Sequence, residues 1–297
     1  MEDEEQQHAS LVILYEAMVQ LTVEPGRFDS IARRLTEDLN MVLEGGLPEF
    51  FKHPLNFLFY TDYDHLEKIA EVILENGISE PNFRYTGARL CDYLSLHLTV
   101  IIEGATLRQI LMQKCNSLFK SRETLLGENP DRLRGFTMFL AELFQQLEIQ
   151  VGAVVQRVSV LGDALPQLVC TLASKPNKEN VRCLVQTLKC CGSVLEEEER
   201  SKPGGATPTM DRTMETLDRL ADSKDLEEGL EEMLRSLVRL RAAHWGHSPP
   251  GSTAVQVPRI PNLHHCSTFF RRCQAHSNLT LPSMHLMERQ VPHLFLI

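Results

Sequence analysis

Residues 28–42 read FDSIARRLTEDLNMV, and this stretch decides the fold class. Its apolar side chains recur at intervals of three and four residues, at Phe28, Ile31, Leu35, Leu39 and Val42. Residues at this spacing share one face of an α-helix, whereas in a strand they would fall on both faces. The stretch therefore predicts an amphipathic helix that buries one side.

The same pattern continues on both sides of this helix. Ser10 is a capping residue for a preceding helix, which Pro25-Gly26 ends. The helices predicted after it cover about 64–76, 83–98, 106–126, 131–149, 151–174, 177–199, 209–220 and 225–245. Consecutive helices make pairs at a spacing of about 40 residues, the period of helical solenoid repeats. Since strand-like alternation is nearly absent, we predict an all-α chain of about five antiparallel helix pairs. An irregular helical bundle would show the same periodicity.

Two segments depart from the helical pattern. Residues 45–63 (GGLPEFFKHPLNFLFYTDY) contain two prolines and six aromatic residues without a helical stripe, and we interpret them as an inserted loop. From Ser248 onward there are four arginines and one glutamate, with no lysine or aspartate, and prolines are scattered. We predict an acidic N-terminal tail at 1–9, a helical-repeat domain at 10–247 and a disordered tail at 248–297.

Composition restricts the functional classes. The chain has 297 residues and a formal net charge of −10, so its overall field does not favour non-specific binding to nucleic acid. The acidic N-terminus lacks the order of a signal peptide, and no run of about 20 apolar residues suggests a membrane span. We therefore expect a cytoplasmic protein with no membrane association.

No enzyme signature is present, and we predict neither catalytic residues nor a cofactor nor a small-molecule substrate. Phosphate-binding loops, nucleophile elbows and zinc-protease motifs are all missing from the sequence. His264, His265, Cys266 and Cys273 could supply four zinc ligands, but adjacent histidines rarely bind one ion, so no metal site is predicted. Cys183, Cys190 and Cys191 are expected to be small buried hydrophobic residues.

Five segments resemble one known family. Residues 79–94 (SEPNFRYTGARLCDYL) resemble the second helix pair of the middle domain of eukaryotic initiation factor 4G (MIF4G). Residues 107–115 (LRQILMQKC), 139–144 (FLAELF) and 235–246 (RSLVRLRAAHWG) are similar to later elements of that domain. Residues 189–196 (KCCGSVLE) resemble the family members that interact with poly(A)-binding protein. The matches run in order along most of residues 10–247.

The resemblance implies a HEAT-like helical-repeat solenoid and a non-catalytic scaffold that promotes translation initiation. The partner it implies first is the DEAD-box helicase of initiation factor 4A. Initiation factor 3, poly(A)-binding protein and mRNA are further candidates. Family members also occur in mRNA decay and in cap-linked complexes. A scaffold of that kind, binding RNA directly, is the alternative function.

Within the matching segments, Arg89 and Arg241 are the candidate partner-binding residues, because arginine forms bidentate pairs with carboxylates and phosphates. The other interpretation is that they pack between repeats, as we expect of Phe83, Leu90, Leu94, Leu143 and Trp245. Direct RNA binding would require a basic stripe, for which Arg33-Arg34, Lys114 to Arg122 and Arg132 to Arg134 are the candidates.

Overall fold

The computed structural model describes residues 2–44, 65–99, 105–151, 154–202, 204–223 and 226–246. The chain divides into two compact units, Met1–Pro249 and Pro250–Ile297. All described residues belong to the first unit. The predicted loop at 45–63, the predicted tail at 248–297 and the histidine and cysteine residues at 264–273 lie outside the described residues.

The described residues are almost entirely helical, which confirms the all-α prediction. The first two helix pairs are α1 (Glu2–Val23) with α2 (Phe28–Leu43), and α3 (His65–Ser79) with α4 (Arg84–His97). The third combines α5 (Leu107–Lys120) and the short α6 (Arg122–Glu128) with α7 (Pro130–Gln146). The last two are α8 (Ser159–Ala173) with α9 (Lys178–Ser201), and α10 (Pro208–Ala221) with α11 (Leu230–Ala242). Short 3-10 turns lie at Pro25–Arg27 (η1) and His244–Gly246 (η3).

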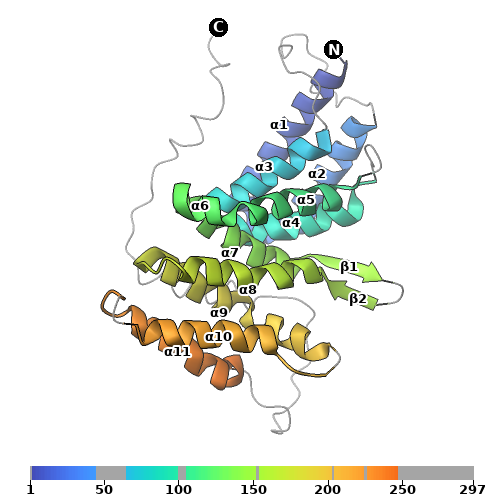
Figure 1. Ribbon diagram of the computed structural model, residues 1–297. Coiled ribbons are helices and arrows are strands. Elements are labelled where there is room, and N and C mark those ends of the chain that lie inside the picture. The colour runs from blue at the N-terminus through green and yellow to red at the C-terminus, as the bar shows by residue number, and fades with distance from the viewer. Residues whose placement is uncertain are drawn as a thin grey trace. The chain divides into compact units, whose positions relative to one another are not determined.

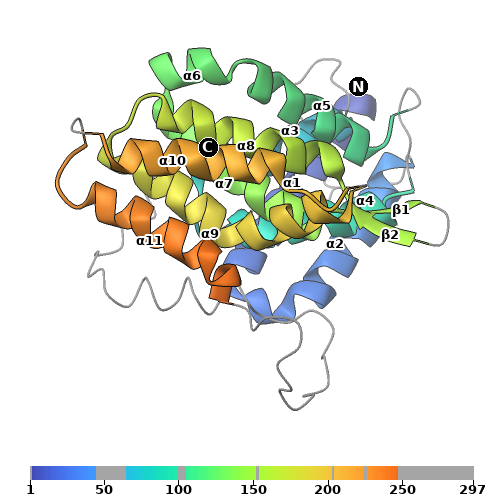
Figure 2. The same cartoon turned by 60° about the horizontal axis from the view of Figure 1, so that its bottom comes forward.

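The pairs stack in sequence order. The second helices form one layer, in which α2 packs on α4, α4 on α7, α7 on α9 and α9 on α11. The first helices form the other, with α1 on α3, α3 on α5 and α8 on α10. Figure 1 shows the pairs following one another from α1–α2 at the top to α10–α11 at the bottom, and Figure 2 shows the two layers from another side. This is the arrangement expected of helical repeats, in which each pair buries its apolar face against its neighbours.

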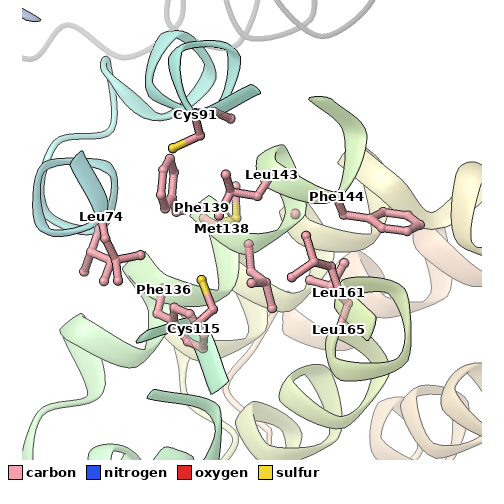
Figure 3. Packing of buried hydrophobic residues seen from close by; sticks show 14 of the residues in the cluster. Leu74, Cys91, Cys115, Phe136, Met138, Phe139, Leu143, Phe144, Leu161 and Leu165 are labelled. Atoms are coloured by element: carbon pink, nitrogen blue, oxygen red, sulfur yellow. The ribbon is translucent and has the colours of Figure 1, made fainter. Parts of the chain in front are cut away.

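Helix α7 is the centre of the core. It packs against α3, α4, α6, α8 and α9, and its residues 135–144 are all buried. Figure 3 shows Phe136 beside Cys115 of α5 and Phe139 beside Cys91 of α4. Because an aromatic side chain buries 150–250 Å² or so, these phenylalanines contribute much of the hydrophobic stabilisation between repeats.

The structure corrects several predicted element boundaries. A β-hairpin of β1 (Glu148–Val151) and β2 (Val154–Arg157) stands where the sequence predicted the end of one helix and the start of the next. Its register pairs Glu148 with Arg157 and Ile149 with Gln156. The sequence of this segment is short and rich in β-branched residues, which favour a strand.

Two helices also differ from the prediction. Helix α1 begins at Glu2, so residues 2–9, predicted as a tail, are helical. The helix predicted over 106–126 is divided at Ser121 into α5 and α6. Thr106 and Gln109 form a capping box at the start of α5, which explains why that boundary was predicted correctly.

Candidate functional site

Arg241 lies at the contact between the last helix pair and α9. Its guanidinium pairs with Glu196 of α9 at 3.2 Å and with Asp211 of α10, and it donates to the hydroxyl of Thr207 at 3.3 Å. Trp245 donates from Nε1 to the same Glu196 at 2.6 Å, and its ring lies against Gly192. We call Glu196, Arg241, Asp211, Thr207 and Trp245 the α9–α11 clasp. One guanidinium thus joins three successive helices.

The charges of the clasp stabilise one another. Burial lowers the pKa of Arg241, but hydrogen bonds to Asp211 and Glu196 outweigh burial, so that its pKa lies above the ordinary value. The hydrogen bond from Arg241 in turn lowers the pKa of Asp211. Both shifts favour the charged pair, which indicates an ion pair that holds the last repeat in place.

Replacing Arg241 by methionine is expected to lower the free energy of unfolding by about 2 kcal/mol. The side chains of Arg241 and Glu196 are only 18% and 12% exposed, so the change removes the shielded cation from this carboxylate. Glu196 then keeps only the more exposed Arg200, at 3.1 Å, and the hydrogen bond from Trp245. The matched control is Arg239→Met, because Arg239 pairs with Glu232 on the surface and such pairs contribute only about 0–1 kcal/mol. Chemical denaturation measures both values. If both substitutions lowered the free energy of unfolding equally, the proposed stabilising role of the α9–α11 clasp would be contradicted.

Acidification is expected to release the last helix pair first. The folded-state pKa of Asp211 is depressed by Arg241, so its contribution is complete above 3.8, the ordinary value, and is lost as the pH falls through the depressed value. Hydrogen–deuterium exchange at pH 7 and near pH 3 measures this, and α10 and α11 should lose protection before α3 and α7. In the control variant Asp211→Asn, the amides of α10 and α11 should exchange faster than in the unchanged chain already at neutral pH. Loss of protection in all helices at the same pH would contradict the expectation.

Arg89 occupies a different environment, between α2 and α4. Its guanidinium carbon lies 3.9 Å from the centre of the Phe28 ring and 5.9 Å from that of Tyr85. It also pairs with Asp29 at 3.6 Å. One third of its side chain is exposed, so it both packs between repeats and reaches the surface. Partner contact by Arg89 or Arg241 stays a prediction.

The basic segments proposed for RNA binding are mostly paired within the protein. Lys114 of α5 pairs with Glu67 of α3 at 2.8 Å. Arg132 of α7 forms two hydrogen bonds with Glu75 of α3, at 2.5 and 2.6 Å. Arg134 binds Asn180 of α9 at 2.7 Å. These side chains connect neighbouring repeats, and this weakens the argument for a basic stripe that holds phosphates.

The cysteines and the predicted core residues contribute to packing. Cys183 and Cys191 are buried and Cys190 is half-buried, which largely confirms the prediction for these residues. Burial raises the pKa of the Cys183 thiol to about 11 and of Cys115 to about 12. Phe83, Leu90, Leu94 and Leu143 are core residues as predicted, whereas Trp245 is partly buried.

Neither a metal cluster nor a membrane-spanning helix is found among the described residues. There, no group of three or more histidine, cysteine, aspartate or glutamate residues is placed to hold a metal ion. Within the same ranges, no helix combines the length and apolar character that spanning a bilayer requires.

Sequence reasoning missed one surface feature. Tyr85, Arg89, Tyr93 and His97 lie four residues apart and so share one face of α4. The spacing is visible in the sequence, where Tyr85, Arg89 and Tyr93 belong to the segment at 79–94 that resembles the family.

Comparison with known proteins gives consistent matches. The chain matches the MIF4G domain family over residues 32–244. It is 34% identical over 207 residues to polyadenylate-binding protein-interacting protein 1 of Xenopus laevis, covering 68% of this chain and 44% of that protein. It is 29% identical over 135 residues to the CBP80/20-dependent translation initiation factor of Xenopus tropicalis, covering 45% of this chain and 22% of that protein.

A more distant match is to eukaryotic translation initiation factor 4 gamma 1 of Mus musculus. The two are 22% identical over 247 residues, covering 72% of this chain and 14% of the relative. The chain therefore spans less than half the length of each of these three relatives.

Proposed function

The chain belongs to the MIF4G domain family, and on this premise we propose that it is a non-catalytic scaffold that regulates translation initiation. The observation that carries the proposal is the family match over residues 32–244, which runs from within α2 through α11 and so includes the four later helix pairs in full. The names of all three relatives above refer to translation initiation or to polyadenylate-binding protein. A stack of helix pairs offers long surfaces to partners, which suits a scaffold.

The partner proposed first is the DEAD-box helicase of initiation factor 4A, in the cytoplasm. Initiation factor 3 is a further candidate from the resemblance to the middle domain of initiation factor 4G. Poly(A)-binding protein is a candidate because a relative with 34% identity is named for that interaction. Binding to these partners would promote initiation by bringing the helicase to the mRNA.

A scaffold of mRNA decay or of cap-linked complexes, binding RNA directly, is the second candidate function. The match to a CBP80/20-dependent factor favours a cap-linked role. Against direct RNA binding stands the pairing of Lys114 and Arg132 with glutamates of α3. We therefore place this function second.

A pull-down with the full chain from cytosolic extract tests the proposal. The extract is treated with nuclease so that RNA cannot bridge, and the bound fraction is probed for the helicase and for poly(A)-binding protein. Recovery of the helicase supports the scaffold function. Recovery of a decay or cap-binding complex without the helicase supports the second function. Recovery of none of these by a chain with a helical circular-dichroism spectrum contradicts both.

A further inference from the structure

Four flat side chains follow one another along one face of α4. Tyr85, Arg89, Tyr93 and His97, which we call the α4 row, are spaced four residues apart, so that neighbours are about 6 Å apart along the helix. The rings of Tyr93 and His97 are in contact at a tilt of 47°, with their centres 4.3 Å apart. The guanidinium of Arg89 lies over the Phe28 ring and within 5.9 Å of the centre of the Tyr85 ring. All four side chains are at least partly exposed. The row is therefore an aromatic surface whose shape is already set by internal contacts.

The row also has unused hydrogen-bonding groups. Within the described parts of the chain, the hydroxyls of Tyr85 and Tyr93 form no hydrogen bond. Tyrosine is well suited to binding surfaces because its ring packs against apolar groups while its hydroxyl donates. A peptide ligand meets both needs of these tyrosines, because its apolar groups pack on the rings and its backbone carbonyls accept from the hydroxyls.

The charges beside the row favour a particular kind of ligand. Asp29, which pairs with Arg89 at 3.6 Å, is 83% exposed. The whole chain carries a formal net charge of −10. A phosphate backbone would gain little from such a surface, since nucleic-acid affinity depends on clustered cations. A neutral or basic peptide is the better electrostatic match.

We propose that the α4 row is a docking surface for a proline-rich peptide segment that carries a basic residue. Such a segment forms a polyproline II helix, which has no internal hydrogen bonds and leaves its carbonyls free to accept from Tyr85, Tyr93 and Arg89. Its proline rings pack on the tyrosine faces. About four residues of this helix cover the ~12 Å between Tyr85 and Tyr93. The basic residue pairs with Asp29. This partner is separate from the helicase of the proposed function.

Fluorescence polarisation with the full chain tests the proposal. The probe is a fluorescein-labelled peptide of sequence RPLPPLPPRPLP, and the matched probe RGLSGLSSRGLS has the same charge without the polyproline II conformation. Saturable binding of the first probe only is expected. The double substitution Tyr85→Leu/Tyr93→Leu should raise its Kd at least about five-fold, because it removes two aromatic contacts and two donors. The control Tyr15→Leu changes a tyrosine of α1 that is 45% exposed and should leave the Kd unchanged.

Each other outcome contradicts the proposal. Absence of saturable binding by a folded chain, equal binding of both probes, or an equal effect of Tyr15→Leu would each overturn it. So would binding of a twelve-nucleotide uridine RNA, but not the proline-rich probe, in a manner that depends on Tyr85 and Tyr93. Thermal melting followed by circular dichroism verifies that every variant is folded. Helicase recovery by Tyr85→Leu/Tyr93→Leu should equal that of the unchanged chain, so failure here is distinguishable from failure of the proposed function.

Discussion

Replacing Gly135 by alanine is expected to lower the free energy of unfolding by about 3 kcal/mol. Gly135 lies on α7 where it crosses α3, and an added Cβ would be 2.3 Å from the carbonyl oxygen of Ile78 and 3.0 Å from its Cγ2. The backbone of α3 is held there by Arg84, which donates to the carbonyls of Gly77 and Ile78, both at 3.3 Å. The clash is therefore with backbone that Arg84 already holds in place, and the two helices must separate.

Gly127 provides the matched control for this substitution. It also lies in a helix, α6, but its Cβ would meet nothing closer than Lys175 Nζ at 4.0 Å. Gly127→Ala should therefore be neutral or stabilising by up to about 1 kcal/mol, the intrinsic helix preference of alanine over glycine. Urea denaturation measures both variants. A loss below about 1 kcal/mol for Gly135→Ala would mean that α3 and α7 do not approach so closely.

Replacing Phe139 by alanine is expected to lower the free energy of unfolding by about 4 kcal/mol. Phe139 is fully buried on α7, beside Cys91 of α4, and its ring fills the space that a side chain at Gly77 of α3 would occupy. Removing the ring leaves a cavity where three helices from two repeats meet. Neighbouring repeats depend on each other for burial, so the loss is expected to weaken the whole stack rather than one helix.

Leu96→Ala on α4 is the control for the Phe139 substitution. Its side chain is 59% exposed, so truncation should change the free energy of unfolding by no more than about 0.5 kcal/mol. Urea denaturation again provides the measurement. If both substitutions lowered the free energy of unfolding by the same amount, Phe139 would not have the central role in packing that the structure gives it.

Much of the fold could be predicted from the sequence, because the spacing of apolar residues that marks a helix is a local feature of the chain. The stripe of Phe28, Ile31, Leu35 and Leu39 is buried as the spacing predicts. The hairpin at 148–157 could not be found in this way, because a strand of four residues carries too little alternation to be recognised. Where long helices begin and end depends on tertiary contacts, and so α1 was predicted to start too late.

The candidate site was less predictable than the fold. Arg241 could be singled out by its place in a matching segment, but its pairing with Glu196 joins residues 45 positions apart in the sequence. Arg132 and Glu75 are 57 positions apart and likewise could not be paired from spacing. The α4 row is the exception, because residues four apart on one helix can be recognised in the sequence without a structure.

The central claim is that the chain acts as a scaffold for the initiation-factor-4A helicase. The most direct test is isothermal titration calorimetry of the purified full chain with the purified helicase, both free of RNA. We expect saturable binding with a defined stoichiometry, retained in Arg239→Met and Tyr15→Leu, which change surface side chains outside the repeat contacts. Absence of binding heat at several temperatures, from a chain whose helices melt cooperatively, would contradict the scaffold function and leave the family assignment intact.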